Sequence, residues 1–181
     1  MHEVSLGQSI RDYISGREIE ATTYEDLRQA IARLLVEEKG YPKERLASKE
    51  AIEFEIDGKK FSRSIDITAY DQNGQPLLVV MFCPGDVRTY VKEAVCAGRL
   101  HPEGPSRLVL VTDTNEARLV CVADSQILEE GGYHQIPAWN RLRELADKCP
   151  AYALTEENKD KIQRLFYTFS ELSACCGDSC K

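Results

Sequence analysis

The sequence has no apolar run long enough to cross a bilayer. Its apolar stretches, such as residues 77–82, are far shorter than the roughly 18 residues that a membrane helix needs. Met1 to Ser5 also lack the positive segment followed by an apolar segment that marks an export signal. We therefore expect a cytoplasmic protein with no membrane contact.

Several signatures of catalysis and metal binding are missing as well. No GxSxG, GxGxxG or Walker sequence occurs, which excludes the commonest serine-hydrolase and nucleotide-binding loops. The three histidines, His2, His101 and His134, are scattered without metal-ligand spacing, and we expect them on the surface or in turns. The seven cysteines are an odd number and, without an export signal, are expected to be reduced thiols.

Basic residues are fewer than acidic ones. The 23 Lys and Arg residues against 30 Asp and Glu residues give a formal net charge of −7 and a pI near 5.1. This balance argues against phosphate binding over the whole surface, because such binding depends on cations that displace counterions. A local basic groove stays compatible with it. The length of 181 residues and the 43% hydrophobic content suit one globular core with a small appendage.

The hydrophobic pattern predicts a helix near the N-terminus. Residues 1–20 are polar and irregular, and we expect an arm or a short helix there. Thr22 or Thr23 can cap the following helix, and Gly40 and Pro42 come in the order expected past a helix end. The apolar stripe of this helix consists of Tyr24, Leu27, Ile31, Leu34 and Leu35.

Three strands in a meander are predicted next. Alternation over residues 52–56 predicts a strand, and Asp57-Gly58 is a hairpin signal. The second strand is predicted to place Ile65, Ile67 and Ala69 on one face and Asp66, Thr68 and Tyr70 on the other. After a turn at Asn73-Gly74, the apolar run 77–82 is typical of a central strand that is covered on both faces.

The second half predicts helices and one further pair of strands. The elements expected are a helix at 87–100, strands at 108–111 and 119–122, a turn at Gly131-Gly132, and helices at 139–148 and 156–172, with Trp139 in the core. The order favours an α/β fold in which helices flank a mixed central sheet. A crossover helix would make the third and fourth strands parallel. We expect an arm at 1–20, a core at 21–125, and a C-terminal helical extension with a Cys-rich tail at 126–181.

An ordered set of these residues resembles a known family. The segment YEDLRQAIARLLVEEKGYPKERLASKEAIEFEIDGKKFSRSIDITAYDQNGQPLLVVMFCPGD, and RLVLVTDTNEARLV after it, are similar to the N-terminal nuclease region of type I restriction enzyme R subunits and of small stand-alone proteins that carry that region. The resemblance covers residues 24–125. It implies a restriction endonuclease-like core of the PD-(D/E)xK class: a helix, a three-strand meander, a helix and two strands.

The resemblance also implies where a nuclease site would lie. Phosphodiester cleavage needs a hard divalent cation such as Mg²⁺, held by carboxylates, and a lysine that stabilises developing charge. Carried over by position, the Asp is Asp66, the Glu falls on Met81 and the Lys falls on Cys83. A thioether is a poor ligand for Mg²⁺, and a thiol carries no positive charge at neutral pH. We therefore expect an inactive site with no bound cofactor.

Other acidic groups near this site leave an alternative open. An active Mg²⁺-dependent endonuclease could use Asp66 with a relocated carboxylate from Glu25, Glu50 or Glu93. Glu25 and Glu50 have plainer interpretations as a helix-dipole residue and a solvated strand end. Met81 and Cys83 are interpreted as core side chains.

The C-terminal cysteines support a third hypothesis, a metal- or redox-responsive protein. Cys175, Cys176 and Cys180, with Cys149 as a fourth candidate, could bind zinc or part of an iron–sulfur cluster. Their spacing matches no paired knuckle, and we interpret them first as an oxidation-prone tail. The leading hypothesis is an inactive nuclease-like module that binds DNA or a protein of a restriction system.

Overall fold

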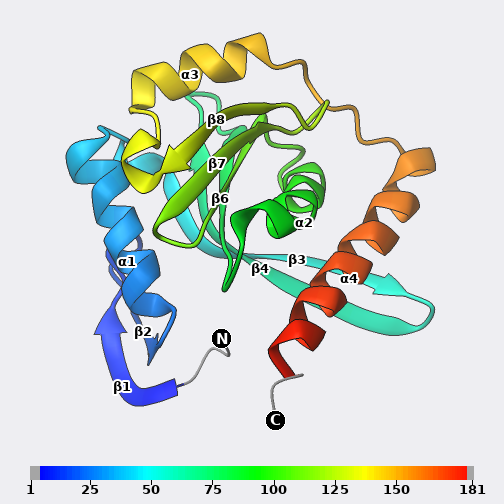
Figure 1. The fold of residues 1–181 in the computed structure, drawn as a ribbon, viewed down its shortest axis with the longest axis horizontal. Coiled ribbons are helices and arrows are strands. Elements are labelled where there is room, and N and C mark those ends of the chain that lie inside the picture. The colour runs from blue at the N-terminus through cyan, green and yellow to red at the C-terminus, as the bar shows by residue number, and fades with distance from the viewer. Residues whose placement is uncertain (1–4, 179–181) are drawn as a thin grey trace.

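The central feature of the computed structural model is a six-stranded mixed sheet (Figure 1). The structure describes residues 5–178, with side chains as far as Leu172. The strands of this sheet, in their spatial order, are β3 (Leu46–Ile56), β4 (Lys59–Tyr70), β5 (Pro76–Phe82), β6 (Leu108–Thr112), β7 (Glu116–Cys121) and β8 (Ile127–Gly132). Only β5 and β6 are parallel, and α2 (Val87–Arg99) connects them.

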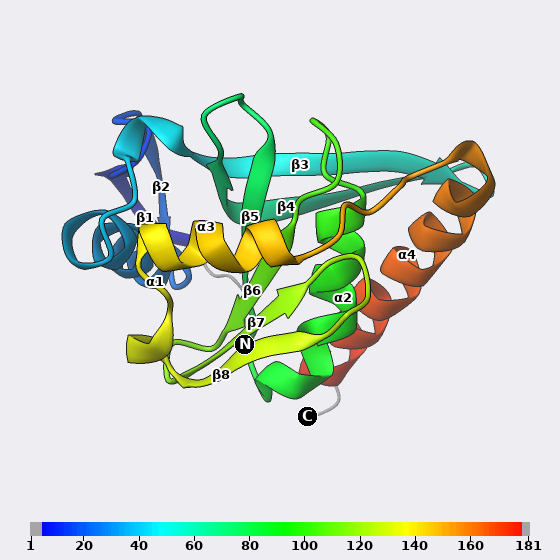
Figure 2. The same ribbon diagram turned by 90° about the horizontal axis from the view of Figure 1, so that it is seen from above.

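Helices cover both faces of the sheet. On one face α1 (Glu25–Arg33) and α3 (Trp139–Lys148) pack over a core that includes Phe82, Leu110 and Leu142. On the other face α2 and α4 (Glu156–Asp178) pack over a second core that includes Val79, Val109 and Phe166. Figure 2 shows this arrangement from above, with α3 and α4 on different sides of the sheet. All seven residues of β5 are buried, as a strand covered on both faces requires.

Most of the predicted elements are confirmed. The meander β3–β4–β5, the helix α2, the parallel pair β5–β6 and the antiparallel pair β6–β7 all form. The predicted turns at Asp57-Gly58 and Asn73-Gly74 have positive φ at Asp57, Gly58 and Gly74, where glycine and Asp are favoured. In the described residues, no helix combines the length and apolar character required to cross a membrane.

Three strands were not predicted. The polar segment expected to be an arm forms a hairpin of β1 (Ser5–Arg11) and β2 (Glu18–Thr22), a separate two-stranded sheet. The expected turn at Gly131-Gly132 lies at the end of β8, so the segment from residue 126 begins as sheet and not as a helical extension. The first helix also differs: it starts at Glu25, and after Arg33 it continues as a π-helical segment, Leu34–Glu38.

The N-terminal hairpin is fixed to the core through Asp12. Its buried carboxylate accepts hydrogen bonds from Gln29 Nε2 at 2.9 Å and from Ser48 Oγ at 3.0 Å, and it pairs with Arg28 Nη2 at 3.0 Å. Burial opposes the charge, but the Ser15 and Gln29 hydrogen bonds and the Arg28 guanidinium lower the pKa of Asp12 far below its usual range. A buried carboxylate with these partners stays ionised and holds β1, α1 and β3 together.

The predicted alternation of the second strand is wrong at Asp66. Ile65 belongs to the core under α2 and α4, whereas Ile67 and Ala69 belong to the core under α1 and α3. On the neighbouring strand β3, the residues that pair with Ile65 and Ile67 flank Lys49. Lys49 has a φ of +57°, which is unusual for a residue with a side chain. The face that β4 presents to each core therefore changes between Ile65 and Ile67, at the predicted site residue Asp66.

We predict that Gly98→Ala destabilises the fold. A Cβ on Gly98 would lie 2.6 Å from Val109 Cγ1 and 2.9 Å from Val122 Cγ2, so α2 can approach the sheet only with glycine there. The expected loss is about 1–3 kcal/mol in the free energy of unfolding, measured by urea denaturation. Gly85→Ala is the control, because its Cβ would meet Tyr90 at an ordinary 3.9 Å. Equal stability of the two variants would contradict the close approach.

Candidate functional site

The two strands that carry the predicted site lie side by side. β4 and β5 are antiparallel, with Ile67 opposite Val80 and Thr68 opposite Val79. Asp66 is half-buried, and its Oδ2 accepts a hydrogen bond from the backbone N–H of Phe82 at 2.8 Å. Asp66, the aspartate that the family resemblance singles out, therefore accepts a hydrogen bond from the backbone between Met81 and Cys83.

Met81 and Cys83 are core residues, as interpreted from the sequence. Their exposed fractions are 3% and 5%, and both pack in the core under α2. The Cys83 thiol donates to the carbonyl oxygen of Gly85 at 3.4 Å. Burial raises the pKa of Cys83 to about 12, with further increases from the carboxylates of Asp113 and Asp86. The thiol is therefore neutral at pH 7 and supplies no charge next to Asp66.

A tyrosine at the start of α1 faces the same place. Burial raises the pKa of Tyr24, and the charges that act on its hydroxyl come from Tyr90, Arg63, Asp66 and Cys83. These side chains come from the N-cap of α1, from α2, from the middle of β4 and from the residue after β5. From the sequence, Tyr24 was predicted only as part of the apolar stripe of the first helix. The local pattern does not show which residues of other segments lie near its hydroxyl.

Glu25, an alternative carboxylate, is part of a buried ion-pair network. Its Oε2 accepts from Arg28 Nε at 3.0 Å, and its Oε1 pairs with the ammonium of Lys49. Arg28 in turn pairs with Asp12. Two cations therefore neutralise this carboxylate, and the interpretation of Glu25 as a simple helix-dipole residue is incomplete.

Glu93, a second alternative, is also paired. Its Oε1 accepts from Arg63 Nε at 3.1 Å and from Ser170 Oγ at 3.0 Å, so this buried carboxylate joins β4, α2 and α4. An arginine that neutralises a carboxylate competes with any metal ion for the same oxygens.

Glu50, the third alternative, lies in a polar cluster beneath the C-terminal end of α2. Its Oε1 accepts from the Tyr70 hydroxyl at 2.5 Å, and its Oε2 lies 3.4 Å from His101 Nε2, which is also 3.2 Å from Thr68 Oγ1. The prediction of a surface or turn position for His101 is wrong, because its exposed fraction is 3%. The His101 Nδ1 atom accepts the backbone N–H of Glu103 at 3.2 Å, which leaves the ring proton on Nε2.

These contacts show how poorly the site suits magnesium. Mg²⁺ prefers oxygen ligands in octahedral geometry, usually from more than one carboxylate or from phosphate. Of the carboxylates considered, Glu25, Glu50 and Glu93 already receive cationic or hydroxyl donors, and β5 presents sulfur. Among side chains 5–172, no three His, Cys, Asp or Glu residues are grouped as metal ligands. The residues present therefore do not fit a magnesium ion.

The predicted cysteine site falls largely outside the described side chains. Cys175 and Cys176 lie in the last part of α4, where only the backbone is described, and Cys180 lies outside the described residues. Cys149 is buried where α3 ends, and burial raises its pKa to about 12.

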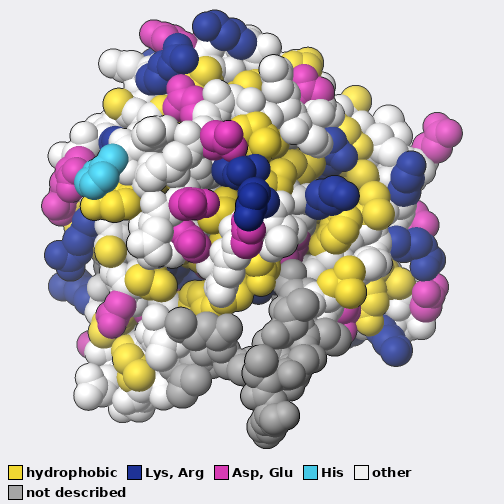
Figure 3. All heavy atoms as spheres, viewed as in Figure 1, with side chains coloured by type: hydrophobic (Ala, Val, Ile, Leu, Met, Phe, Trp, Pro, Cys, Tyr) yellow, Lys and Arg dark blue, Asp and Glu magenta, His cyan; other side chains and the backbone are white. Residues whose placement is uncertain are grey.

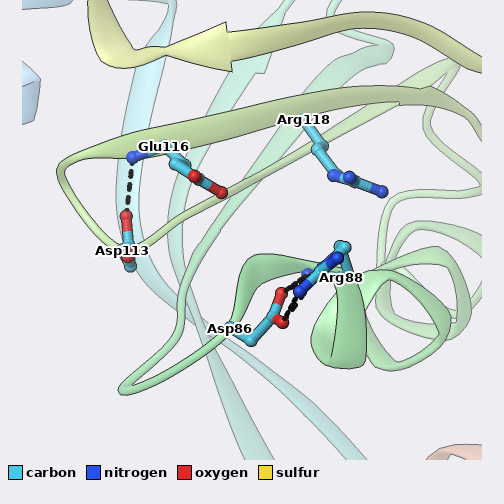
Figure 4. Close-up of a pocket in the computed structure, with 5 residues that line it drawn as sticks. All are labelled: Asp86, Arg88, Asp113, Glu116 and Arg118. Atoms are coloured by element: carbon cyan, nitrogen blue, oxygen red, sulfur yellow. Dashed lines mark hydrogen bonds and ion pairs between the residues drawn. The ribbon is translucent and has the colours of Figure 1, made fainter.

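A charged depression of about 390 Å³ opens beside the site, and it was not predicted (Figure 4). Its lining residues are Asp86, Arg88, Asp113, Glu116 and Arg118. They come from the N-terminus of α2 and from the β6–β7 hairpin, where the parallel strands end. Arg88 and Asp86 pair with each other, and Arg118 pairs with Glu130 at 2.9 Å. Only the position of Asp86 at the start of α2 could be read from the sequence.

The fold and the placement of these residues define the class of protein. A meander followed by a crossover helix and a parallel strand, with helices on both faces, is consistent with a restriction endonuclease-like fold. The family model for the N terminus of the type I restriction enzyme R protein matches residues 23–137, and the chain belongs to this family. Comparisons with curated proteins and with solved structures gave no match.

We predict a structural role for Asp66. Asp66→Ala removes the acceptor for the Phe82 N–H between two central strands, and an unpaired buried donor costs about 1–3 kcal/mol. Asp66→Asn keeps an acceptor oxygen and is expected to lose much less. Urea denaturation of both variants checks this. Equal losses would show that the charge, and not the hydrogen bond, matters.

Acid should weaken the Glu50 cluster. Burial alone would raise the pKa of Glu50, but hydrogen bonds from His101, Thr68 and Tyr70 outweigh burial and lower it to about 2. Because the pKa of Glu50 is lower in the folded state than its unfolded-state value near 4.5, the ionised carboxylate stabilises the fold at pH values above 4.5. This contribution to the free energy of unfolding is on the order of 2 kcal/mol, and it is lost as the pH falls toward 2.

Tyr70→Phe tests whether the Tyr70 hydroxyl lowers the pKa of Glu50, because it removes one hydrogen-bond donor to that carboxylate. The loss of stability between pH 5 and pH 2 should then be smaller than in the wild type, as measured by urea denaturation at a series of pH values. Tyr152→Phe, in the segment between α3 and α4, is the control and should show the wild-type pH dependence. An unchanged profile in Tyr70→Phe would contradict the role of its hydroxyl.

Proposed function

We propose that this chain is a catalytically inactive member of its family, a restriction-system module that binds nucleic acid or a protein partner and does not cleave DNA. One observation carries the proposal: the residues on either side of Phe82, next to Asp66, are a buried thioether (Met81) and a buried neutral thiol (Cys83). Cleavage of a phosphodiester needs a held cation or an equivalent positive charge at the phosphate. Neither side chain supplies it.

The surrounding acidic residues support the same proposal. Relocation of the catalytic carboxylate would need Glu25, Glu50 or Glu93 to turn toward Asp66. Each would first leave a partner: Lys49 and Arg28, Tyr70 and His101, or Arg63. Removing one member of a buried pair is strongly destabilising, by about 3–5 kcal/mol, so these partners hold the carboxylates where they are.

We predict no cleavage of double- or single-stranded DNA with Mg²⁺ or Mn²⁺. A gel assay should show the same background for the wild type and for Asp66→Ala. Cleavage by the wild type that disappears in Asp66→Ala would overturn the proposal in favour of an active enzyme with a relocated carboxylate.

The double variant Met81→Glu, Cys83→Lys is the matched gain-of-function control. It restores the anion and the ammonium of the family pattern beside Asp66, and it should bind Mn²⁺ in titration calorimetry where the wild type does not. Circular dichroism establishes that it folds despite two charges at buried positions. Saturable Mn²⁺ binding by the wild type itself, lost in Asp66→Ala, would count against the inactive site.

A further inference from the structure

Two cations lie over one aromatic ring on the side of the molecule formed by the N-terminal hairpin and α1. Arg33 Cζ is 5.4 Å from the centroid of the Tyr13 ring, and Lys43 Nζ is 4.4 Å from it. Tyr13 lies in the turn between β1 and β2, Arg33 ends α1, and Lys43 begins a short 3₁₀ segment, Lys43–Arg45. We call these three residues the Tyr13 cluster. Three separate segments of the chain therefore bring it together.

The two cations of the Tyr13 cluster are exposed and lack carboxylate partners. Neither Arg33 nor Lys43 forms an ion pair with any of the residues that the structure describes. Both distances are measured to the same centroid, so the charges lie less than 10 Å apart, about one Debye length at physiological ionic strength. Their repulsion is therefore incompletely screened, and an anion between them would relieve it.

The ring itself is held in place. The Tyr13 backbone N–H donates to Gln29 Oε1 at 2.7 Å, and its hydroxyl donates to Glu37 Oε1 at 3.1 Å. Among the side chains that the structure describes, Glu37 is the carboxylate that hydrogen-bonds to the cluster, at the hydroxyl of the Tyr13 ring. The cluster keeps an excess of positive charge on a protein whose net charge is −7. Figure 3 shows Lys and Arg side chains at the left edge of the molecule, beside α1, with acidic side chains above and below them.

We propose that the Tyr13 cluster binds the phosphate groups of a nucleic-acid backbone, an inference that rests on the nucleic-acid-binding form of the proposed function. A guanidinium binds phosphate oxygens through two parallel N–H groups, and an ammonium binds them as a point charge. Both cations lie over the ring, so it acts as their support and not as a platform for a base. Contacts of this kind carry no sequence preference.

The first test removes the two charges. Binding of labelled duplex and single-stranded oligonucleotides of mixed sequence is measured by fluorescence anisotropy at several salt concentrations. Arg33→Gln with Lys43→Gln should weaken binding at least about tenfold and lower the salt slope by about two. Arg143→Gln with Lys161→Gln removes the same charge from exposed positions on α3 and α4 and should change affinity less than about twofold. Equal losses in the two double variants would overturn the proposal.

The second test separates the ring from the charge. Tyr13→Phe keeps the support for both cations and should bind like the wild type. Tyr13→Leu leaves the net charge unchanged but releases Arg33 and Lys43, and we expect affinity to fall several-fold. Thermal unfolding establishes that each variant is folded. Wild-type affinity in Tyr13→Leu would overturn the proposed role of the ring.

The outcomes distinguish this inference from the proposed function. No nucleic-acid binding by the wild type, even at low salt, would overturn the phosphate site while the inactive-nuclease proposal still stands on the cleavage assay. Binding that depends on the Tyr13 cluster, together with Asp66-dependent cleavage, would support the phosphate site and overturn the inactive module. Binding that depends on the cluster without cleavage supports both.

Discussion

The hydrogen bond from the Phe82 N–H to the Asp66 carboxylate is the constraint around which the site is arranged. It joins two central strands at the point where β4 changes the core that it faces. An interruption of the backbone hydrogen bonds between these strands would leave the Phe82 N–H buried without an acceptor. The Asp66 carboxylate accepts this hydrogen bond in place of a backbone carbonyl. A residue type that family resemblance connects with metal binding thus has a second use in folding, which does not depend on Met81 or Cys83.

The acidic residues near the site are explained by pairing with distant parts of the chain. Glu25, Glu50 and Glu93 each receive a donor from a different element, and each joins a helix or strand to its neighbour. Charges buried in this way resist displacement, because separation leaves an uncompensated ion in a medium of low dielectric constant. A buried thioether at Met81 and a buried thiol at Cys83 therefore coexist with an intact framework of paired polar side chains.

The sequence predicted the parts of the fold whose side chains alternate or recur with a clear period. β5, α2 and α3 bury one stripe or both faces, and their boundaries follow from that pattern. The hairpin β1–β2 was missed because β1 is almost entirely exposed and only the last two residues of β2 are buried, so no alternating apolar pattern marks either strand. β8 was missed for a similar reason, since its residues are polar, small or only half-buried.

The adjacency of the strands that carry Asp66 and Met81 was predictable, but the contacts of the residues around them were not. Resemblance placed Asp66 beside Met81 and Cys83, and the strand pairing agrees with that placement. The burial of His101 and the face change at Asp66 arise from contacts between distant segments, such as that of His101 with Thr68 and Glu50, and such contacts leave no local signal. Tyr24 and the charged depression come together only through the fold.

The contacts of Asp12 with Arg28 and Gln29 determine which part of the chain unfolds as one cooperative unit. The family model begins at residue 23, yet Arg28, inside it, is 2% exposed and relies on Asp12 for one of its two anionic neighbours. A chain trimmed to the matched residues would enclose a guanidinium with too little negative charge around it. The hairpin therefore belongs to the same thermodynamic unit as the sheet, and substitutions on the two sides of that boundary are expected to be coupled in their effects on stability.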